Sequence, residues 1–147
     1  MKNEDSNMNG EFNAAIHALV CLAHKGSLIS SEALAANICT NAARVRKIMS
    51  KLKTAEFVSA KEGPEGGYML KKAATDITLA SVAEALGVQF VSPGWHSGAV
   101  DMECLIASGM AARLDDIYGQ LNALCQNRLT QITIWDLENS IFGRTSE

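Results

Sequence analysis

Apolar side chains recur at the three- and four-residue spacing of α-helices along most of this 147-residue chain. The first such segment places five apolar residues on one helical face: Phe12, Ile16, Leu19, Val20 and Ala23. Gly26 follows this segment and can adopt the left-handed conformation that ends many helices. A second, short helix is expected over residues 31–38, because the hydroxyl of Ser30 can cap its first free N–H groups.

A third helix is expected from Ala42 to about Thr54, with Asn41 as its N-cap. Its apolar face has the spacing i, i+3, i+4, i+7 and consists of Val45, Ile48, Met49 and Leu52. Small, polar and cationic residues occupy the remaining positions. Apolar and cationic side chains are therefore separated on this helix.

A β-hairpin is expected next, with strands over residues 57–61 and 68–70. The six residues between the strands include three glycines and a proline, as a tight turn requires. A further short helix is expected over residues 79–86, capped by Thr78 and ended by Gly87. The order helix, turn, basic helix, hairpin predicts a winged helix-turn-helix, which is a mainly α fold with a small β-hairpin wing.

The pattern lapses over residues 89–101, where glycine, proline and serine indicate a loop. A long helix is then expected from about Met102 to Asn127. Its apolar residues form a narrow stripe with alternating spacings of four and three: Met110, Leu114, Ile117, Leu121 and Leu124. A stripe of this width is typical of two packed helices, so we expect a homodimer; a helix folded back on its own domain is the alternative.

These elements divide the chain into three segments. The winged helix-turn-helix domain is expected over residues 8–88 and a linker over 89–101. Residues 102–147 hold the dimerisation helix and a final short helix, which is expected from a cap at Thr133 to about Phe142.

Charge is distributed unevenly along the chain. The total net charge is −3, but residues 44–72 contain eight basic and three acidic side chains and carry +5, so the rest carries −8. Local charge determines the field at a phosphate-binding face, so this distribution favours DNA binding at the third helix and the hairpin. An ordinary solvated basic surface is the alternative.

The candidate DNA contacts combine small or polar residues, which let the backbone approach base edges, with cations for phosphates. Arg44 or Arg46 could contact guanine with two hydrogen bonds. Glycines at the hairpin tip allow a close approach of the main chain. The full set is Asn41, Ala43, Arg44, Arg46, Lys47, Ser50, Lys51, Lys61, Gly66, Gly67 and Tyr68.

Several short motifs in this order resemble the IscR/NsrR/CymR (Rrf-type) family of bacterial winged helix-turn-helix transcriptional regulators. The motifs cover residues 15–19, 31–35, 45–52, 63–68, 76–79 and 133–137. The resemblance implies a dimeric transcription factor, usually a repressor, that binds a palindromic DNA operator through the third helix and the wing.

The chain departs from this family in its cysteines. Members that bind an iron–sulfur cluster carry three cysteines in the loop before the long helix, whereas residues 89–103 contain none and only Cys104 follows. A cluster normally needs about four ligands, so we expect no cofactor. The three histidines show no metal-ligand spacing, and we expect no metal.

The resemblance also includes thiol switches. We therefore expect Cys39, in the turn before the third helix, and Cys104, from the same chain or from two different chains, to form an oxidation-sensitive pair that controls DNA affinity. Cys21 and Cys125 adjoin apolar faces and are expected to serve in packing. Four inert thiols are the alternative.

No motif for a nucleophile, a phosphate loop or paired catalytic carboxylates is present, so the chain is not expected to be an enzyme. No apolar run is long enough for a membrane span, and the polar start lacks the features of a secretory signal, so a cytoplasmic protein is expected. The leading interpretation is a DNA-binding regulator whose signal is an oxidant or a small molecule. A protein-interaction adaptor, which holds a partner enzyme instead of DNA, is the alternative.

Overall fold

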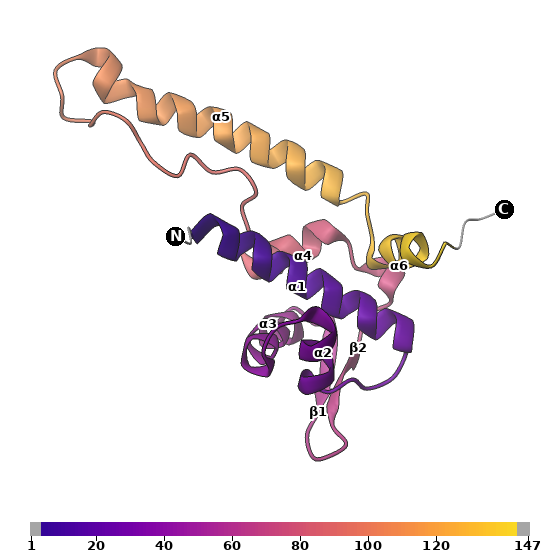
Figure 1. Ribbon diagram of the computed structural model, residues 1–147. Helices are drawn as coiled ribbons and strands as arrows, with labels where there is room; N and C mark the ends of the chain where they lie inside the picture. Colours follow the sequence, from indigo (N-terminus) through magenta and orange to yellow (C-terminus); the bar gives the residue numbers. More distant parts are fainter. Residues whose placement is uncertain (1–3, 144–147) are drawn as a thin grey trace.

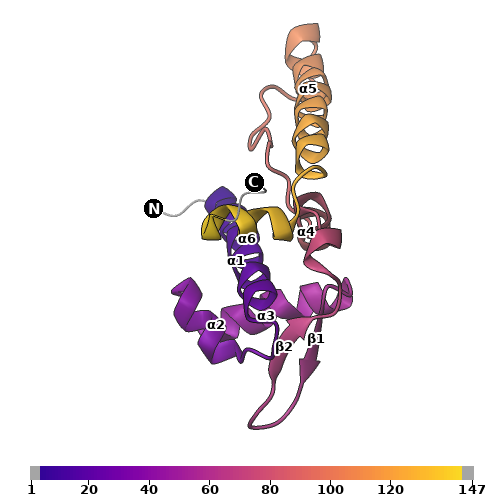
Figure 2. The same cartoon turned by 90° about the vertical axis from the view of Figure 1, so that its right-hand side faces the viewer.

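Helix α1 (Glu4–Lys25) runs through the middle of the molecule in the computed structural model, which describes residues 4–143. The helix-turn-helix and the wing lie on one side of α1, and the long helix α5 projects on the other side (Figures 1 and 2). In chain order, the elements after α1 are α2 (Ser31–Ile38), α3 (Ala42–Thr54), β1 (Val58–Lys61), β2 (Gly67–Leu70), a 3-10 turn η1 (Ala74–Asp76), α4 (Leu79–Leu86), α5 (Leu105–Leu129) and α6 (Ile134–Phe142).

Side-chain caps start four of these helices where the sequence predicts them. Ser30 Oγ accepts a hydrogen bond from the Ala33 N–H at the start of α2, and Asn41 Oδ1 accepts one from the Arg44 N–H at the start of α3. Thr78 caps α4, and Thr133 forms a reciprocal capping box with Asp136 at the start of α6. Each cap satisfies backbone donors that a helix start leaves free, which is worth about 1 kcal/mol.

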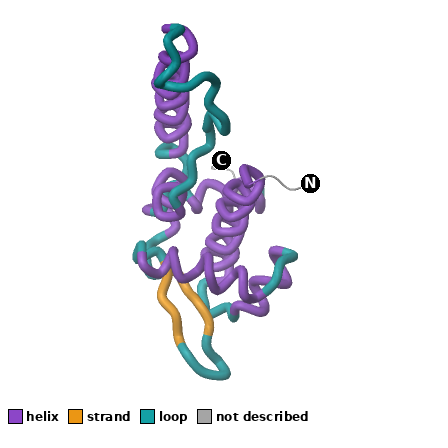
Figure 3. Tube along the Cα trace, turned by 90° about the vertical axis from the view of Figure 1, so that its left-hand side faces the viewer, coloured by secondary structure: helices purple, strands orange, loops and turns teal. Residues whose placement is uncertain are grey.

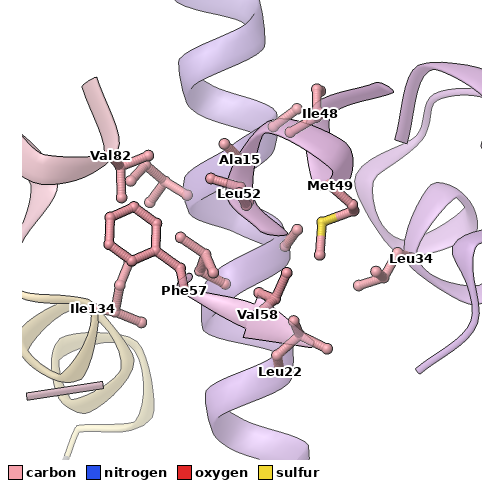
Figure 4. Close-up of a cluster of buried hydrophobic side chains, with 14 of the residues drawn as sticks. Ala15, Leu22, Leu34, Ile48, Met49, Leu52, Phe57, Val58, Val82 and Ile134 are labelled. Carbon is pink, nitrogen blue, oxygen red and sulfur yellow. The ribbon is translucent and has the colours of Figure 1, made fainter. Parts of the chain in front are cut away.

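The hydrophobic core lies where α1, α3, α4, α6 and the first strand meet (Figure 4). The predicted apolar face of α3 is confirmed, because all four of its residues are buried. Leu19 and Leu22 of α1, Phe57 before the wing and Val82 of α4 complete the centre of the core.

Helix α6 is attached to this core and not to α5. Ile134 is fully buried, and its N–H donates to the Ile77 carbonyl over 3.0 Å. The Leu79 N–H donates to the Ile132 carbonyl over 2.8 Å, so the two segments pair just before α4 and α6 begin. The sequence grouped this last helix with α5 in residues 102–147; residues 144–147 of that segment lie outside the described residues.

Helix α5 begins later than predicted, at Leu105 instead of Met102, and ends at Leu129 instead of Asn127. Cys104 takes the N-cap position with an extended backbone (φ −64°, ψ 122°) and makes no side-chain cap. Apolar spacing alone shows which side chains share a face but does not show where a helix starts. Since no capping side chain marks the start of α5, the predicted first residue of this helix was wrong.

The loop before α5 is held against that helix. The Asn122 side chain hydrogen-bonds both backbone groups of Val91, and His96 Nε2 lies 2.8 Å from Asp115 Oδ1. Helix α5 itself has no buried residue within the described chain. No helix of the described residues is long and apolar enough to cross a membrane.

The wing is an antiparallel hairpin in which Ser59 pairs with Met69 and Lys61 with Gly67. Ile29, in the loop before α2, extends this sheet, because its N–H donates to the Tyr68 carbonyl over 3.0 Å and its carbonyl accepts from Tyr68 over 2.9 Å. The close approach depends on Gly67, whose φ is 153°: a Cβ atom there would lie 2.5 Å from the Ile29 carbonyl oxygen.

Replacing Gly67 with alanine should therefore loosen the wing. We expect Gly67→Ala to lower the free energy of unfolding by about 1–3 kcal/mol, because the added Cβ meets backbone atoms that cannot move away cheaply. Urea denaturation gives the stability, and hydrogen exchange at the amides of Ile29 and Tyr68 should accelerate. Gly119→Ala is the matched control, because its added Cβ has no atom within 4 Å. Alanine in a helix interior is also more stable than glycine by up to about 1 kcal/mol, so this variant should not be destabilised. Unchanged stability and exchange in Gly67→Ala would contradict this account of the wing.

Candidate nucleic-acid interface

Helix α3 presents an exposed face opposite its buried one. The turn before it is tight, because Cys39 ends α2 in the left-handed conformation with a φ of 69°. Asn41 then starts α3 two residues later. The exposed face carries Ala43, Lys47, Ser50 and Thr54, as the sequence predicts. Small and polar groups on this face leave room for a base edge or a phosphate.

Arg46 lies on the flank of α3 that faces the wing. Its Nη1 donates to Ser31 Oγ over 3.2 Å and lies 3.5 Å from Glu32 Oε2, so the guanidinium bridges α3 to the start of α2. The side chain is 53% exposed and remains accessible to a further partner. The sequence did not predict the contacts with Ser31 and Glu32.

Arg46 and the wing share a cleft of about 310 Å³, which is also lined by Lys61, Gly66, Gly67 and Tyr68. Partial burial raises the pKa of the Tyr68 hydroxyl, although the positive charge of Arg46 acts in the opposite direction. At neutral pH the hydroxyl is therefore a neutral donor. The structure brings these five predicted contact residues together in one place.

The opposite flank of α3 faces α1. Lys51 Nζ lies 3.1 Å from both carboxylate oxygens of Glu11, and both side chains are more than half covered. Arg44 lies against Gly10: a Cβ atom on Gly10 would come within 2.9 Å of Arg44 Nη2. The sequence predicts DNA contacts for both cations; in the structure Lys51 is paired with Glu11, and Arg44 is exposed beside Gly10.

The wing tip itself is of mixed charge. Lys61 is exposed there beside Glu62 and Glu65. Gly66 permits the turn, since a Cβ atom on it would lie 2.1 Å from the Lys61 carbonyl oxygen. At the base of the wing, Lys71 pairs with Glu56, and the hydrogen bond and charge of Lys71 lower the pKa of that carboxyl.

Lys53 is an exposed cation that the predicted contact set left out. It follows Arg46 by seven residues, which is two helical turns, and so shares the flank that faces the wing. The helical spacing contains this signal. Arg46, Lys47, Lys53 and Lys61 together give the described surface of α3 and the wing a cationic stripe.

The structure does not bring Cys39 and Cys104 together within one chain. Both are exposed, but the end of α2 and the start of α5 lie on opposite sides of α1 (Figures 1 and 2). Cys21 is half-buried and is more than a packing residue: its Sγ donates a hydrogen bond to Asn37 Oδ1 over 3.3 Å. Burial raises the pKa of this thiol, so it stays protonated at neutral pH.

Residues 8–140 match the sequence model of the Rrf2 family, which is described as an iron-dependent transcriptional regulator. The chain's own donors do not fit an iron site. In residues 4–143, no group of three or more His, Cys, Asp or Glu side chains is placed to hold a metal ion. The four cysteines lie in α1, at the end of α2, before α5 and within α5. No step of the function is therefore assigned to iron.

Known relatives agree with the family. The chain is 28% identical over 135 residues to YwnA of Bacillus subtilis, whose name describes an HTH-type transcriptional regulator; the match covers 92% of this chain and 99% of YwnA. A crystal structure of a transcriptional regulator candidate from Lactobacillus plantarum matches with a TM-score of 0.77 and 24% identity over 91% of both chains.

CymR, the global cysteine regulator of B. subtilis, has the same fold. It matches with a TM-score of 0.63 and 18% identity, over 88% of this chain and 94% of CymR. The family and YwnA are regulators of transcription, so the adaptor interpretation is set aside. The motifs, the winged helix and the extent of the family match lead to one conclusion: this chain belongs to the Rrf2 family and is a DNA-binding transcriptional regulator.

Proposed function

We propose that the protein is a repressor that binds a palindromic DNA operator as a homodimer. The observation that carries this proposal is the position of Arg46, which lies beside the exposed face of α3 and shares a cleft with Lys61 and Tyr68 of the wing. Helix and wing thus present cations and hydrogen-bond donors to the same side. That is the arrangement with which a winged helix contacts a major groove and the adjacent backbone.

The proposed contact set follows the geometry. From α3 and its cap it contains Asn41, Ala43, Arg46, Lys47, Ser50 and Lys53, and from the wing Lys61, Gly66, Gly67 and Tyr68. Arg44, which is exposed beside Gly10, belongs to the set as well, whereas Lys51 pairs with Glu11 and so holds α3 against α1. The acidic remainder of the chain would face away from DNA.

The dimer is supported by the uncovered stripe on α5. Met110, Leu114, Ile117, Leu121 and Leu124 are 38%, 37%, 49%, 41% and 65% exposed. A continuous apolar stripe of this kind is costly in water and typically marks an interface. Pairing with a second copy would bury the stripe and set two α3 helices in successive major grooves, about 34 Å apart.

Arg46→Ala should weaken operator binding without disturbing the fold. We expect a loss of about 1–3 kcal/mol in binding free energy, because the guanidinium is the best-placed group for a guanine edge or a phosphate. Fluorescence anisotropy with a footprinted promoter fragment, measured over a salt series, gives the affinity. For the wild type, log affinity should fall with log salt by about 0.9 per neutralised phosphate.

Arg113→Ala is the matched control for Arg46→Ala, because it removes an exposed arginine from α5, on the other side of α1. Its affinity and salt dependence should equal those of the wild type. If Arg46→Ala binds as tightly as Arg113→Ala, Arg46 is not a DNA contact. A wild type without salt dependence would count against the whole α3–wing interface.

Leu121→Asp should convert the dimer into a monomer, because an unpaired carboxylate would be buried within the stripe. Sedimentation velocity at several protein concentrations gives the oligomeric state. Gln120→Asp adds the same charge one residue earlier on α5, outside the stripe, and should remain dimeric. A dimeric Leu121→Asp protein would place the interface elsewhere.

Control by cysteine oxidation is proposed between subunits, since the two exposed thiols lie apart in one chain. Peroxide would be reduced to water while the thiols of Cys39 and the partner's Cys104 lose their protons and two electrons and form one S–S bond. Mild peroxide should then give a dimer on non-reducing gels that dithiothreitol reverses. Cys39→Ser and Cys104→Ser should each abolish this species, whereas Cys125→Ser should keep it. A species that persists in either of the first two variants, or no species in the wild type, would refute this pairing.

A further inference from the structure

A groove of about 640 Å³ lies between α1, α2 and α6, away from the exposed face of α3. Its walls are mainly apolar and include Phe12, Ile16, Val20, Leu137, Ile141 and Phe142. Its volume is in the range of small-molecule sites, which lies at about 300–1,000 Å³. No lysine or arginine lines it, so it does not favour an anion.

One side of the groove is polar, and there two side chains of α1 converge on Asn37. His17 Nε2 lies 2.7 Å from Asn37 Oδ1, and the Cys21 thiol donates to the same oxygen over 3.3 Å. The raised pKa of Cys21 keeps this thiol protonated and able to donate. Within the described chain, no hydrogen bond engages the Asn37 amide nitrogen, which leaves it available to a ligand acceptor.

The far end of the groove is aromatic. The His24 ring stacks on Phe142, with ring centroids 4.0 Å apart and planes 10° from parallel. His24 Nδ1 also lies 3.1 Å from the buried Glu138 carboxylate, which fixes the ring. A flat apolar ligand would find ring faces and edges here and a hydrogen-bond donor at Asn37.

The polar side of the groove is also the contact between α1 and the helix-turn-helix. His17 and Cys21 belong to α1, whereas Asn37 lies in the last turn of α2, two residues before Cys39 ends that helix. A ligand whose acceptor bonds to the Asn37 amide nitrogen is tied to the same side chain whose Oδ1 accepts from α1. It therefore changes how α2, and with it α3, is held on α1.

We propose that this groove binds an uncharged, mainly aromatic small molecule with one hydrogen-bond acceptor, and that its occupancy changes operator affinity through Asn37. The regulatory half of this statement rests on the proposed DNA-binding function. The binding half stands on the groove alone.

Binding is tested with prodan, an uncharged naphthalene probe that carries a ketone oxygen as hydrogen-bond acceptor and whose fluorescence responds to apolar sites. Titration of the full-length wild type should saturate at one probe per chain. Val20→Trp and Ile141→Trp should each weaken binding by about tenfold or more, because the indole fills the groove. Ile141 is 69% exposed, so its replacement does not endanger folding. Leu105→Trp adds the same ring at an 85% exposed position on α5 and should bind like the wild type.

Three results of the titration would overturn the site: no saturable binding, equal binding by all variants, or probe release when the protein concentration is raised. The last would show that a second copy of the chain covers the groove. The site would also be overturned if Val20→Trp and Ile141→Trp both bound the probe as tightly as the wild type while their circular dichroism showed a native fold.

Coupling is tested by measuring operator affinity with and without saturating probe. The wild type should shift by about fivefold, the effect of roughly one hydrogen bond, and Ile141→Trp should not shift. Asn37→Ala should still bind the probe, but more weakly, and its DNA affinity should not respond to saturating probe. Probe binding with no DNA binding at all would refute the proposed function and leave the ligand site standing. DNA binding that ignores bound probe would overturn the regulatory half.

Discussion

Burial of the apolar face of α1 is the constraint on which the rest of the molecule depends. Leu19 and Leu22 of this helix lie in the same core as Met49 and Leu52 of α3 and Ile134 of α6. Each side chain of this size stabilises the fold by about 1.5–3 kcal/mol when it leaves water. Because α3, α4 and α6 all pack on α1, the position of α3 relative to the rest of the molecule is decided there. These packed helices lie between the wing, orange in Figure 3, and the long helix that projects from the opposite end.

The same packing divides the charges of α3 between two tasks. One flank turns toward α1, where Lys51 is held by Glu11, and the other turns toward the wing, where Arg46 meets the start of α2. Solvent and salt screen a partly covered ion pair less than an exposed one. The pair of Lys51 with Glu11 therefore favours attachment of α3 to α1 over contact of Lys51 with a phosphate. The net charge of the helix therefore overstates the number of cations that can reach DNA.

Helix α1 also contacts α2 and lines the groove beside α6. Its Cys21 and His17 hold Asn37 of α2, and its apolar residues line the groove beside α6. Helix α5, by contrast, buries none of its described residues within the chain. The apolar stripe of α5 is therefore exposed in the single chain, and both this stripe and the groove beside α6 lie away from the exposed face of α3.

The sequence by itself determined the elements, because their signals are local: the caps at Ser30, Asn41 and Thr133 bond to groups only three residues away. The apolar stripes and the order of the motifs likewise indicated a winged helix and a regulator of transcription. Only the tertiary structure decided where each flank of α3 points, since Lys51 and Glu11 are 40 residues apart in sequence and meet only when α1 packs across α3. The groove at Asn37 also depends on tertiary packing, because its lining comes from both α1 and α6. Spacing along one helix identifies a face, but it does not identify the partner that the face will meet.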